Sequence, residues 1–203
     1  MKVAIVGNGA SVLSESWSNE IDVSCDRVVR VNWYEIKGYE EWTGVRTDYW
    51  VTDLWPAKHE LPYGFDEIKE VWVFPDGDRP HTLEGIYKIC RPAHKVAVPI
   101  RREDYLKLYG MLPGKKWPSN GLGAVFMALD YLEPDELLLI GFDAMLGAEE
   151  KSYSYYWGDE ILMERAHGHD FVAEGKALIK LAEEKRLHLI WRRGGCARFS
   201  ASA

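Results

Sequence analysis

Cysteine is scarce in this sequence. Its 203 residues include only three cysteines, Cys25, Cys90 and Cys196, at wide spacing. An odd number of widely spaced cysteines supplies neither a disulfide framework nor the ligand set of a zinc site. We therefore expect a protein of a reducing compartment, the cytoplasm, with no metal centre.

Long apolar runs are also lacking. The longest one, residues 137–140 with its flanks, is far shorter than the ~20 residues that a membrane-spanning helix needs. The sequence enters a strand-like run at its second residue, so we expect no signal peptide. These features predict a chain without a membrane segment.

Positive charge is not in excess. The chain has 25 Lys and Arg residues against 32 Asp and Glu residues, a formal net charge of -7. A protein with a broad nucleic-acid-binding face has the opposite balance. Two basic pairs, Lys115 with Lys116 and Arg192 with Arg193, leave a local nucleic-acid contact open, although solvated surface charge is the simpler interpretation.

Several catalytic motifs are missing. The sequence contains no G-x-x-x-x-G-K-[ST] phosphate loop, no H-E-x-x-H zinc motif and no serine nucleophile elbow. Asp76-Gly77-Asp78 has a form that can hold a nucleotide-bound cation, but it lies within the turn sequence PDGDRP. We therefore predict a turn there and no metal site.

Strand-like and helix-like segments alternate along the chain. Apolar, β-branched runs predict strands at residues 2–6, 27–31, 47–52, 70–74, 95–98, 136–140 and 187–191. Helical spacing predicts helices at residues 11–18, 101–109, 122–132 and 170–186. This alternation predicts an α/β fold over residues 1–193, a single Rossmann-like domain whose mostly parallel sheet has helices on both faces. Residues 194–203 show no pattern, and we expect a loose C-terminal tail there.

A turn of small residues, Gly7-Asn8-Gly9, follows the first predicted strand. Its glycines let backbone N–H groups approach a phosphate or sugar closely, and the Asn8 amide can donate and accept hydrogen bonds. The dinucleotide fingerprint G-x-G-x-x-G is incomplete, because Val12 stands where the third glycine is required. An acidic residue follows in the right region, so a nicotinamide-dependent enzyme stays open as an alternative.

Polar residues stand at two other element ends. Arg30 and Asn32 share one face at the end of the second strand, where open α/β sheets bind ligands. Ser119 and Asn120 precede the helix at 122–132, and either could cap it so that the helix N-terminus faces an anion. Solvated strand termination and plain helix capping are the structural alternatives.

Two later segments contain side chains suited to proton transfer. His169 and Glu174 form an H-x4-E spacing at the start of the last helix. Histidine suits a general base because its reference pKa lies near neutrality. His167 is a rival for that role. The aromatic run at residues 155–158, YYWG, could form a core loop or donate phenolic hydrogen bonds to a phosphate.

Together these segments resemble the four motifs, L, S, III and VS, of the sialyltransferase family of glycosyltransferases. Motif L is matched by the first turn, by Arg30 and Asn32, and by GYE at 38–40 and GVRT at 44–47. Motif S is matched by PSNG at 118–121 and by GF at 141–142. Residues 155–158 match motif III, and the H-x4-E pair matches motif VS. All four motifs appear in the family order.

The resemblance implies a role for each matched residue. In the family, the motif L asparagines bind the nucleotide part of CMP-sialic acid. Motifs L and S thus assign these residues to the donor: Asn8, Gly9, Arg30, Asn32, Ser119, Asn120 and Gly121. Motif III implies that Tyr155 and Tyr156 stabilise the leaving phosphate. Motif VS makes His169 the general base, with Glu174 in support.

The chain also departs from the family pattern. Asn120 stands where threonine is usual, and Tyr155 stands where some members have histidine. Animal members have a disulfide that joins motifs L and S, whereas this chain has Ala4 near the first half-cystine position. We therefore expect a small member of bacterial or phage type.

The resemblance implies an inverting, metal-independent glycosyltransferase without a cofactor. It would move a sugar from a CMP-linked donor to a hydroxyl of a glycan or another acceptor. Two alternatives stay open: a transferase with a UDP-type donor, which could act on a modified nucleobase, and a nucleotide-binding module without catalysis.

Overall fold

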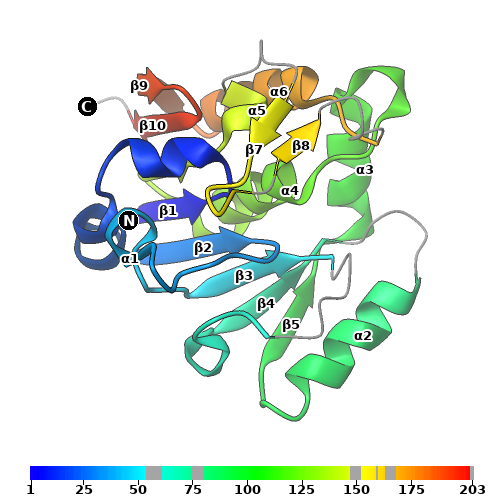
Figure 1. The fold of residues 1–203 in the computed structure, drawn as a ribbon. Coiled ribbons are helices and arrows are strands. Elements are labelled where there is room, and N and C mark those ends of the chain that lie inside the picture. Colours follow the sequence, from blue (N-terminus) through cyan, green and yellow to red (C-terminus); the bar gives the residue numbers. More distant parts are fainter. Residues whose placement is uncertain (54–60, 75–79, 147–151, 159, 163–167, 202–203) are drawn as a thin grey trace.

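The sheet of this protein has eight strands, six of them parallel. The computed structural model describes residues 1–53, 61–74, 80–146, 152–158, 160–162 and 168–201. The parallel strands are β1 (Lys2–Val6), β2 (Arg27–Val31), β3 (Tyr49–Thr52), β4 (Glu70–Val73), β5 (Val96–Pro99) and β6 (Glu136–Ile140). Two antiparallel strands, β9 (Leu187–Arg193) and β10 (Cys196–Ala201), complete it. The strand order is β5-β4-β3-β2-β1-β6-β10-β9 (Figure 1).

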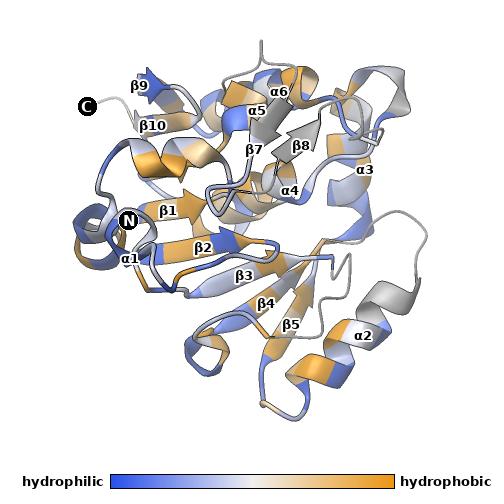
Figure 2. Cartoon of the chain, viewed as in Figure 1, coloured by the Kyte–Doolittle hydropathy of each residue, from blue (hydrophilic) through white to orange (hydrophobic). Residues whose placement is uncertain are grey.

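The central strands are apolar because both faces of the sheet are covered. In β1, Val3 and Ile5 point into one core, whereas Ala4 and Val6 point into another. Figure 2 shows continuous hydrophobic colour along β1, whereas β2 has a hydrophilic end. Parallel strands buried on both faces are typically such unbroken apolar runs. The predicted α/β class, with one mostly parallel sheet and helices on both faces, is confirmed.

Three helices form the larger layer. α3 (Arg102–Met111), α4 (Asn120–Met127) and α6 (Phe171–Glu184) pack on the face that includes Val3 and Ile5. A single π-helical turn, η5 (Ala128–Leu132), continues α4, so the predicted helix at 122–132 begins two residues early and changes type near its end. Buried residues on nearly every side of α4 explain why this helix lies at the centre of the layer.

Shorter elements cover the other face. The 3-10 helix η1 (Ala10–Ser14), the π-helical turn η2 (Glu20–Ser24) and α2 (Pro80–Cys90) supply buried residues there. α1 (Glu40–Thr43), the 3-10 helices η3 (Phe65–Glu67) and η4 (Pro113–Lys115), α5 (Asp143–Leu146) and the hairpin β7 (Ser152–Ser154) with β8 (Glu160–Leu162) complete the described elements. The sequence did not predict α2 or the hairpin, and η1 replaces the longer helix expected at 11–18.

The C-terminal segment is part of the sheet as far as residue 201, so the loose tail predicted for residues 194–203 is wrong over the residues that the structure describes. β10 lies between β6 and β9 and is antiparallel to both. Ala197 and Phe199 are fully buried. A register shift between Arg198 and Phe199 breaks the simple alternation that a strand otherwise shows, which is why the sequence pattern was not evident.

Among the described residues, no helix is long and apolar enough to cross a membrane. Asp76-Gly77-Asp78, where a turn is predicted, and His167 lie outside the residues that the structure describes.

Candidate functional site

The order of the strands reverses next to β1. From β1 the chain proceeds outward through β2, β3, β4 and β5, and it then returns to place β6 on the other side of β1. In open α/β sheets, ligands bind outside the carboxyl ends of the strands at such a reversal. The Gly7-Asn8-Gly9 turn leaves β1 at this position, and Gly141 leaves β6 beside it.

The two turns meet so closely that they exclude side chains. The Gly9 N–H donates to the Gly141 carbonyl at 2.9 Å, and Gly141 has a φ of +74°. A Cβ on Gly9 would lie 1.5 Å from an Asp143 carboxylate oxygen. The same carboxylate accepts from the backbone N–H of Ser11 at 3.2 Å. A side chain at position 9 would collide with Asp143, so glycine is required where the turn after β1 meets the turn after β6.

Asn8 presents an unsatisfied acceptor at this edge. Its side-chain nitrogen donates to the carbonyls of Val31 and Trp33, each at 2.9 Å. Since carbonyls only accept, these contacts fix the orientation of the amide. The Asn8 Oδ1 atom is buried and has no hydrogen-bond partner among the described residues. Such an atom costs roughly 1–3 kcal/mol of desolvation unless a donor satisfies it, which a ligand could do.

Asn32 and Asn120 join motif L to motif S. Asn32 follows β2 in the left-handed region, with a φ of 58°. Its Oδ1 accepts from the side-chain nitrogen of Asn120, the first residue of α4, at 2.5 Å. Asparagine tolerates this backbone conformation better than most residues, and strained positions of this kind gather at binding sites. Two residues that were predicted to bind the sugar donor, from distant segments of the sequence, are thus in direct contact.

Ser119 caps α4 and is itself held by Glu174. Its Oγ accepts from the Leu122 N–H at 3.3 Å. The Ser119 N–H donates to Glu174 Oε1 at 2.9 Å, and Ser119 Oγ lies 2.5 Å from Glu174 Oε2. Burial raises the pKa of Glu174 to about 8, although the hydrogen bonds from Ser119 act in the opposite direction. Glu174 therefore ties the start of α6 to the start of α4.

Gly121 lies in the first turn of α4 and has little room beside it. A Cβ there would come within 2.9 Å of the Met145 side chain and 3.6 Å of the Phe142 ring. The first turn of α4 consequently packs against the segment that follows β6. Its N-terminal N–H groups lie at the same edge of the sheet as the β1 turn.

His169 has a defined tautomer. Its Nδ1 lies 2.7 Å from the carbonyl oxygen of Trp117. A carbonyl cannot donate, so Nδ1 has the proton and the lone pair remains on Nε2. Glu174 Oε1 is 3.6 Å from Nδ1, beyond hydrogen-bond range. The His169 side chain is 34% exposed, which leaves it accessible to a substrate. The sequence did not predict Trp117 as part of the site, although it stands two residues before Ser119.

The aromatic run reaches the β1 turn. Tyr155 forms an antiparallel bridge with Gly9, and the Tyr156 N–H donates to the Asn8 carbonyl at 3.0 Å. The Tyr155 ring stacks on Trp157 with centroids 4.5 Å apart. Motif III thus lies directly against motif L.

Tyr156 has a structural role in this arrangement, unlike the phosphate contact predicted for it. Its side chain is buried, and its hydroxyl donates to the Glu35 carbonyl and accepts from the Glu35 N–H at 2.8 Å. Burial also raises the pKa of this phenol. A hydroxyl that both donates to and accepts from the backbone of Glu35 holds the chain after β2. The phosphate contact predicted for Tyr155 stays a prediction.

Arg30 is held mainly by the backbone of its own motif, and its Nη1 is buried without a hydrogen-bond partner among the described residues. The donor contact predicted for Arg30 stays a prediction. The residue is 0% exposed. Its guanidinium donates to the carbonyls of Thr43, Gly44 and Arg46 and to Thr47 Oγ1 at 2.6–3.1 Å. Burial lowers its pKa. The matched residues of the GVRT segment therefore surround Arg30 and shape a loop.

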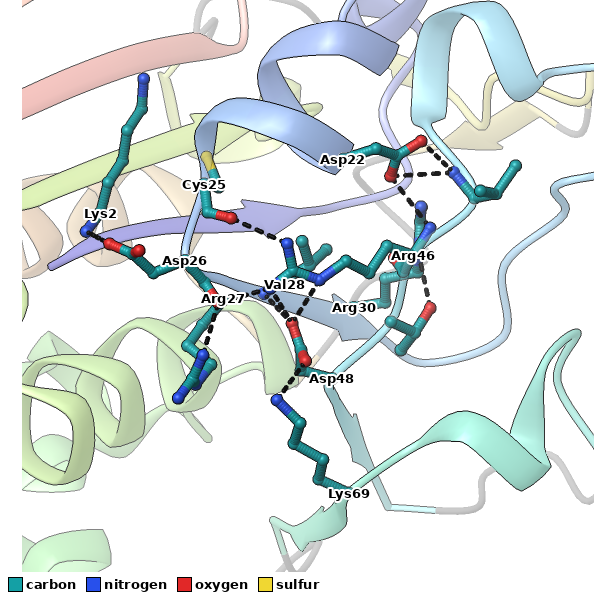
Figure 3. A network of polar contacts seen from close by, with 12 residues as sticks. Lys2, Asp22, Cys25, Asp26, Arg27, Val28, Arg30, Arg46, Asp48 and Lys69 are labelled. Carbon is teal, nitrogen blue, oxygen red and sulfur yellow. Dashed lines mark hydrogen bonds and ion pairs between the residues drawn. The ribbon is translucent and has the colours of Figure 1, made fainter.

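The same loop is fastened from outside by carboxylates (Figure 3). Asp22 accepts from the N–H groups of Val45 and Arg46 at 2.9–3.1 Å. The Asp48 carboxylate forms ion pairs with Arg46 and Lys69, each at 2.7 Å. Burial alone would raise the pKa of Asp48, but the Lys69 ion pair and the Val28 N–H contribute to a net lowering. Much of motif L in this chain therefore builds the fold around Asn8 and Asn32.

The predicted residues form one connected group. Hydrogen bonds join His169 to Trp117, Glu174 to Ser119, Asn120 to Asn32, and Asn8 to Val31. The group contains an unsatisfied acceptor, a helix N-terminus and an imidazole with a free Nε2 lone pair. Among the described residues, no group of three or more His, Cys, Asp or Glu side chains comes together as a metal site would require.

Comparison with known proteins identifies the fold. No protein-family model and no curated protein matches the sequence. A crystal structure of a mammalian sialyltransferase in complex with Gal-beta-1-3GalNAc-ortho-nitrophenol is similar, with a TM-score of 0.63 and 19% identity. A second crystal structure of a mammalian sialyltransferase gives a TM-score of 0.66 and 21% identity. Each comparison covers 90% of this chain but only 66% of the solved one. The chain therefore has the fold of the sialyltransferases.

Proposed function

We propose that the protein is an inverting glycosyltransferase of sialyltransferase type, which moves a sugar from a CMP-linked donor to an acceptor hydroxyl. The observation that carries this proposal is the convergence of four separate motifs at the strand reversal of a sialyltransferase fold. Motif resemblance alone could be fortuitous. Direct contacts between the side chains and backbone of all four motifs are what a shared ligand site requires.

The donor nucleotide would lie between the β1 turn and the start of α4. Asn8 Oδ1 would accept from a ribose hydroxyl or a base amino group, because it lacks an internal donor. The first N–H groups of α4 would face the phosphate, supported by the helix dipole. Ser119 and Gly121 would position this helix start, Ser119 through its cap and its contact with Glu174, and Gly121 through its close packing on Met145.

The transfer step would use His169 as the base. Its Nε2 would take the proton of the acceptor hydroxyl while that oxygen attacks the anomeric carbon. The bond from the anomeric carbon to the phosphate oxygen breaks, and CMP departs with the electron pair. Attack opposite the leaving group inverts the anomeric configuration. Tyr155 and the α4 N–H groups would stabilise the departing phosphate without a metal ion.

A glycan hydroxyl is the acceptor that we propose. The mammalian sialyltransferase of similar fold was solved with a Gal-β-1,3-GalNAc glycoside. The comparison covers only 66% of that solved chain, so the acceptor is proposed here as a class, a glycan hydroxyl, and not as that glycoside. Its place of action, on this proposal, is the cytoplasm.

Calorimetric titration tests the donor. CMP, UDP, UMP and NAD would each be titrated into the protein with EDTA present throughout. We expect CMP to bind most tightly, and CMP-sialic acid then to be consumed in the presence of glycoside acceptors. Tighter binding of UDP would indicate a transferase that uses a UDP-linked donor in place of a CMP-linked one. Binding of NAD alone would make the first turn a dinucleotide site and overturn the proposal.

A further inference from the structure

Trp117 is an exposed aromatic residue held beside the candidate base. It is 40% exposed, although a tryptophan normally buries most of its large apolar surface. Its carbonyl binds His169 Nδ1 at 2.7 Å, and its N–H donates to the Gly168 carbonyl at 2.8 Å. Both backbone groups of Trp117 are therefore tied to the two residues at the base.

The indole itself is fixed by its surroundings. It packs against Tyr109 and Tyr105 of α3, with ring centroids 5.4 and 6.4 Å away. A Cβ built on Gly168 would lie 3.6 Å from Trp117 Cδ1, so the ring also runs alongside the residue before His169. A pre-positioned ring loses little conformational entropy when a ligand stacks on it.

We propose that Trp117 is the platform of the acceptor site, on which a pyranose ring of the acceptor glycan stacks while its hydroxyl faces His169 Nε2. This inference rests on the proposed function, because it takes His169 as the base. The C–H face of a pyranose is apolar, and its hydroxyls lie at the rim. An exposed indole next to a polar group suits such a ligand, since one surface is apolar and the edge is wet.

The charge of the chain separates a sugar from a nucleobase as the stacking partner. Aromatic rings also stack on bases of single-stranded nucleic acid, but those sites line positively charged grooves. This chain has a net charge of -7, and the basic residues next to Trp117 in the sequence are limited to one pair, Lys115 and Lys116. A neutral glycan is therefore favoured over a polyanionic acceptor at Trp117.

The test compares transfer of the sugar to an acceptor with hydrolysis of the CMP-linked donor. Water can attack the donor in place of the acceptor, and it needs no aromatic platform. The donor is CMP-N-acetylneuraminic acid, and the acceptors are a panel of methyl pyranosides and lactose. The variants are Trp117→Ala and Trp117→Phe. Tyr87→Ala is the matched control, since Tyr87 is a 54% exposed aromatic residue on α2, outside the site. Circular dichroism checks that each variant folds.

We expect Trp117→Ala to lower the ratio of transfer to hydrolysis at least tenfold, mainly through a higher acceptor KM. Trp117→Phe should recover most of that ratio, because a flat apolar ring is restored. Tyr87→Ala should leave the ratio unchanged.

Other outcomes overturn the inference. They are an equal loss of transfer and hydrolysis in Trp117→Ala, an unchanged ratio, hydrolysis with no pyranoside accepted, or transfer only to a hydroxymethylated oligonucleotide. Absence of both CMP binding and donor hydrolysis in the unaltered protein would instead refute the proposed function, and the platform with it.

Discussion

At the scale of single residues, two side chains present one functional atom after the fold has used the others. The Asn8 side-chain nitrogen donates to two carbonyls, and its Oδ1 has no donor among the described residues. His169 spends Nδ1 on the Trp117 carbonyl and leaves the Nε2 lone pair. Both are oriented by hydrogen bonds to backbone carbonyls, which fixes the direction of the remaining atom.

The first prediction concerns the base. Replacing His169 by glutamine removes the proton acceptor, so we expect transfer from CMP-sialic acid to fall by about 10²–10⁴-fold. CMP affinity should change little, because His169 contacts none of the asparagines. Initial rates and calorimetry measure the two quantities, and His188→Gln, on the exposed strand β9, is the control. Retention of transfer in His169→Gln would remove its role as the base.

The second prediction concerns the Asn32–Asn120 pair. Asn120→Ala removes the donor to Asn32 Oδ1, so the Asn32 amide loses its fixed orientation. A hydrogen bond of this kind contributes about 1 kcal/mol, which corresponds to an affinity loss of roughly fivefold for CMP. Calorimetry at constant pH measures it. An affinity equal to that of the unaltered protein would mean that Asn32 does not contact the nucleotide.

Sequence reasoning identified these residues but could not assign their roles. Asn8, Asn32, Ser119 and His169 were predicted from motifs, and the structure brings them into one group. Arg30 and Tyr156 were equally good matches, yet the Tyr156 hydroxyl and two of the three Arg30 guanidinium nitrogens bond to backbone groups. A motif records which residues recur together. Whether a side chain faces a ligand or its own backbone depends on long-range packing, which a single sequence does not display.

At the scale of elements, Glu174 connects α6 with α4. Because its pKa is about 8, the folded protein keeps this proton at neutral pH, whereas the unfolded chain releases it near pH 4.5. A protonated Glu174 can donate to Ser119 Oγ through one oxygen and accept the Ser119 N–H through the other. Glutamine has the same donor and acceptor arrangement.

The third prediction follows from that proton. Between about pH 4.5 and pH 8 the folded state binds more protons than the unfolded state, so the free energy of unfolding falls as the pH rises, by up to a few kcal/mol. Glu174→Gln should therefore lose less stability than the unaltered protein between about pH 5 and pH 8. Urea titration at several pH values measures this, with the exposed Glu183→Gln as control. Parallel pH profiles for Glu174→Gln and the unaltered protein would show that Glu174 ionises normally.

The fourth prediction concerns β10, the strand that the sequence did not predict. Phe199 is fully buried against the main core, so Phe199→Ala should cost about 3–5 kcal/mol of unfolding free energy. Ile190→Ala on the neighbouring edge strand β9 should cost far less, because Ile190 is 65% exposed. Denaturant titration of both variants measures the difference. Similar small losses in the two would mean that β10 contributes little to the core.

The elements that were predicted well are those with strong local signals. The apolar runs of β1, β2 and β6 are recognisable without any neighbour, because both faces are buried. β10 is recognisable only beside β6 and β9, since a register shift interrupts its alternation. β5 and β9 are edge strands with many exposed residues, yet their β-branched or aliphatic cores still predicted them.

At the scale of the whole molecule, the site exists because the chain reverses direction around β1. The reversal places the carboxyl ends of β1, β2 and β6 at one edge, and α4 begins there too, with Asn120 in contact with Asn32 across 88 residues of sequence. No local segment contains the complete group. Ligand binding and global stability should consequently be coupled, since a nucleotide would contact segments that come together only in the folded state.

The last prediction uses this coupling to locate the nucleotide. A ligand that binds only the folded state adds about 2.7 kcal/mol of stability at one hundred times its Kd. For a chain of this length, that corresponds to a rise in Tm of about 5–10 °C with CMP. Asn8→Ala removes the unsatisfied acceptor at the strand reversal, so at the same CMP concentration the rise should be clearly smaller. Thermal unfolding with and without CMP, for each protein, measures the two shifts. If CMP stabilises both proteins equally, the nucleotide binds elsewhere on the fold; if the shift depends on Asn8, the reversal at β1 is the donor site.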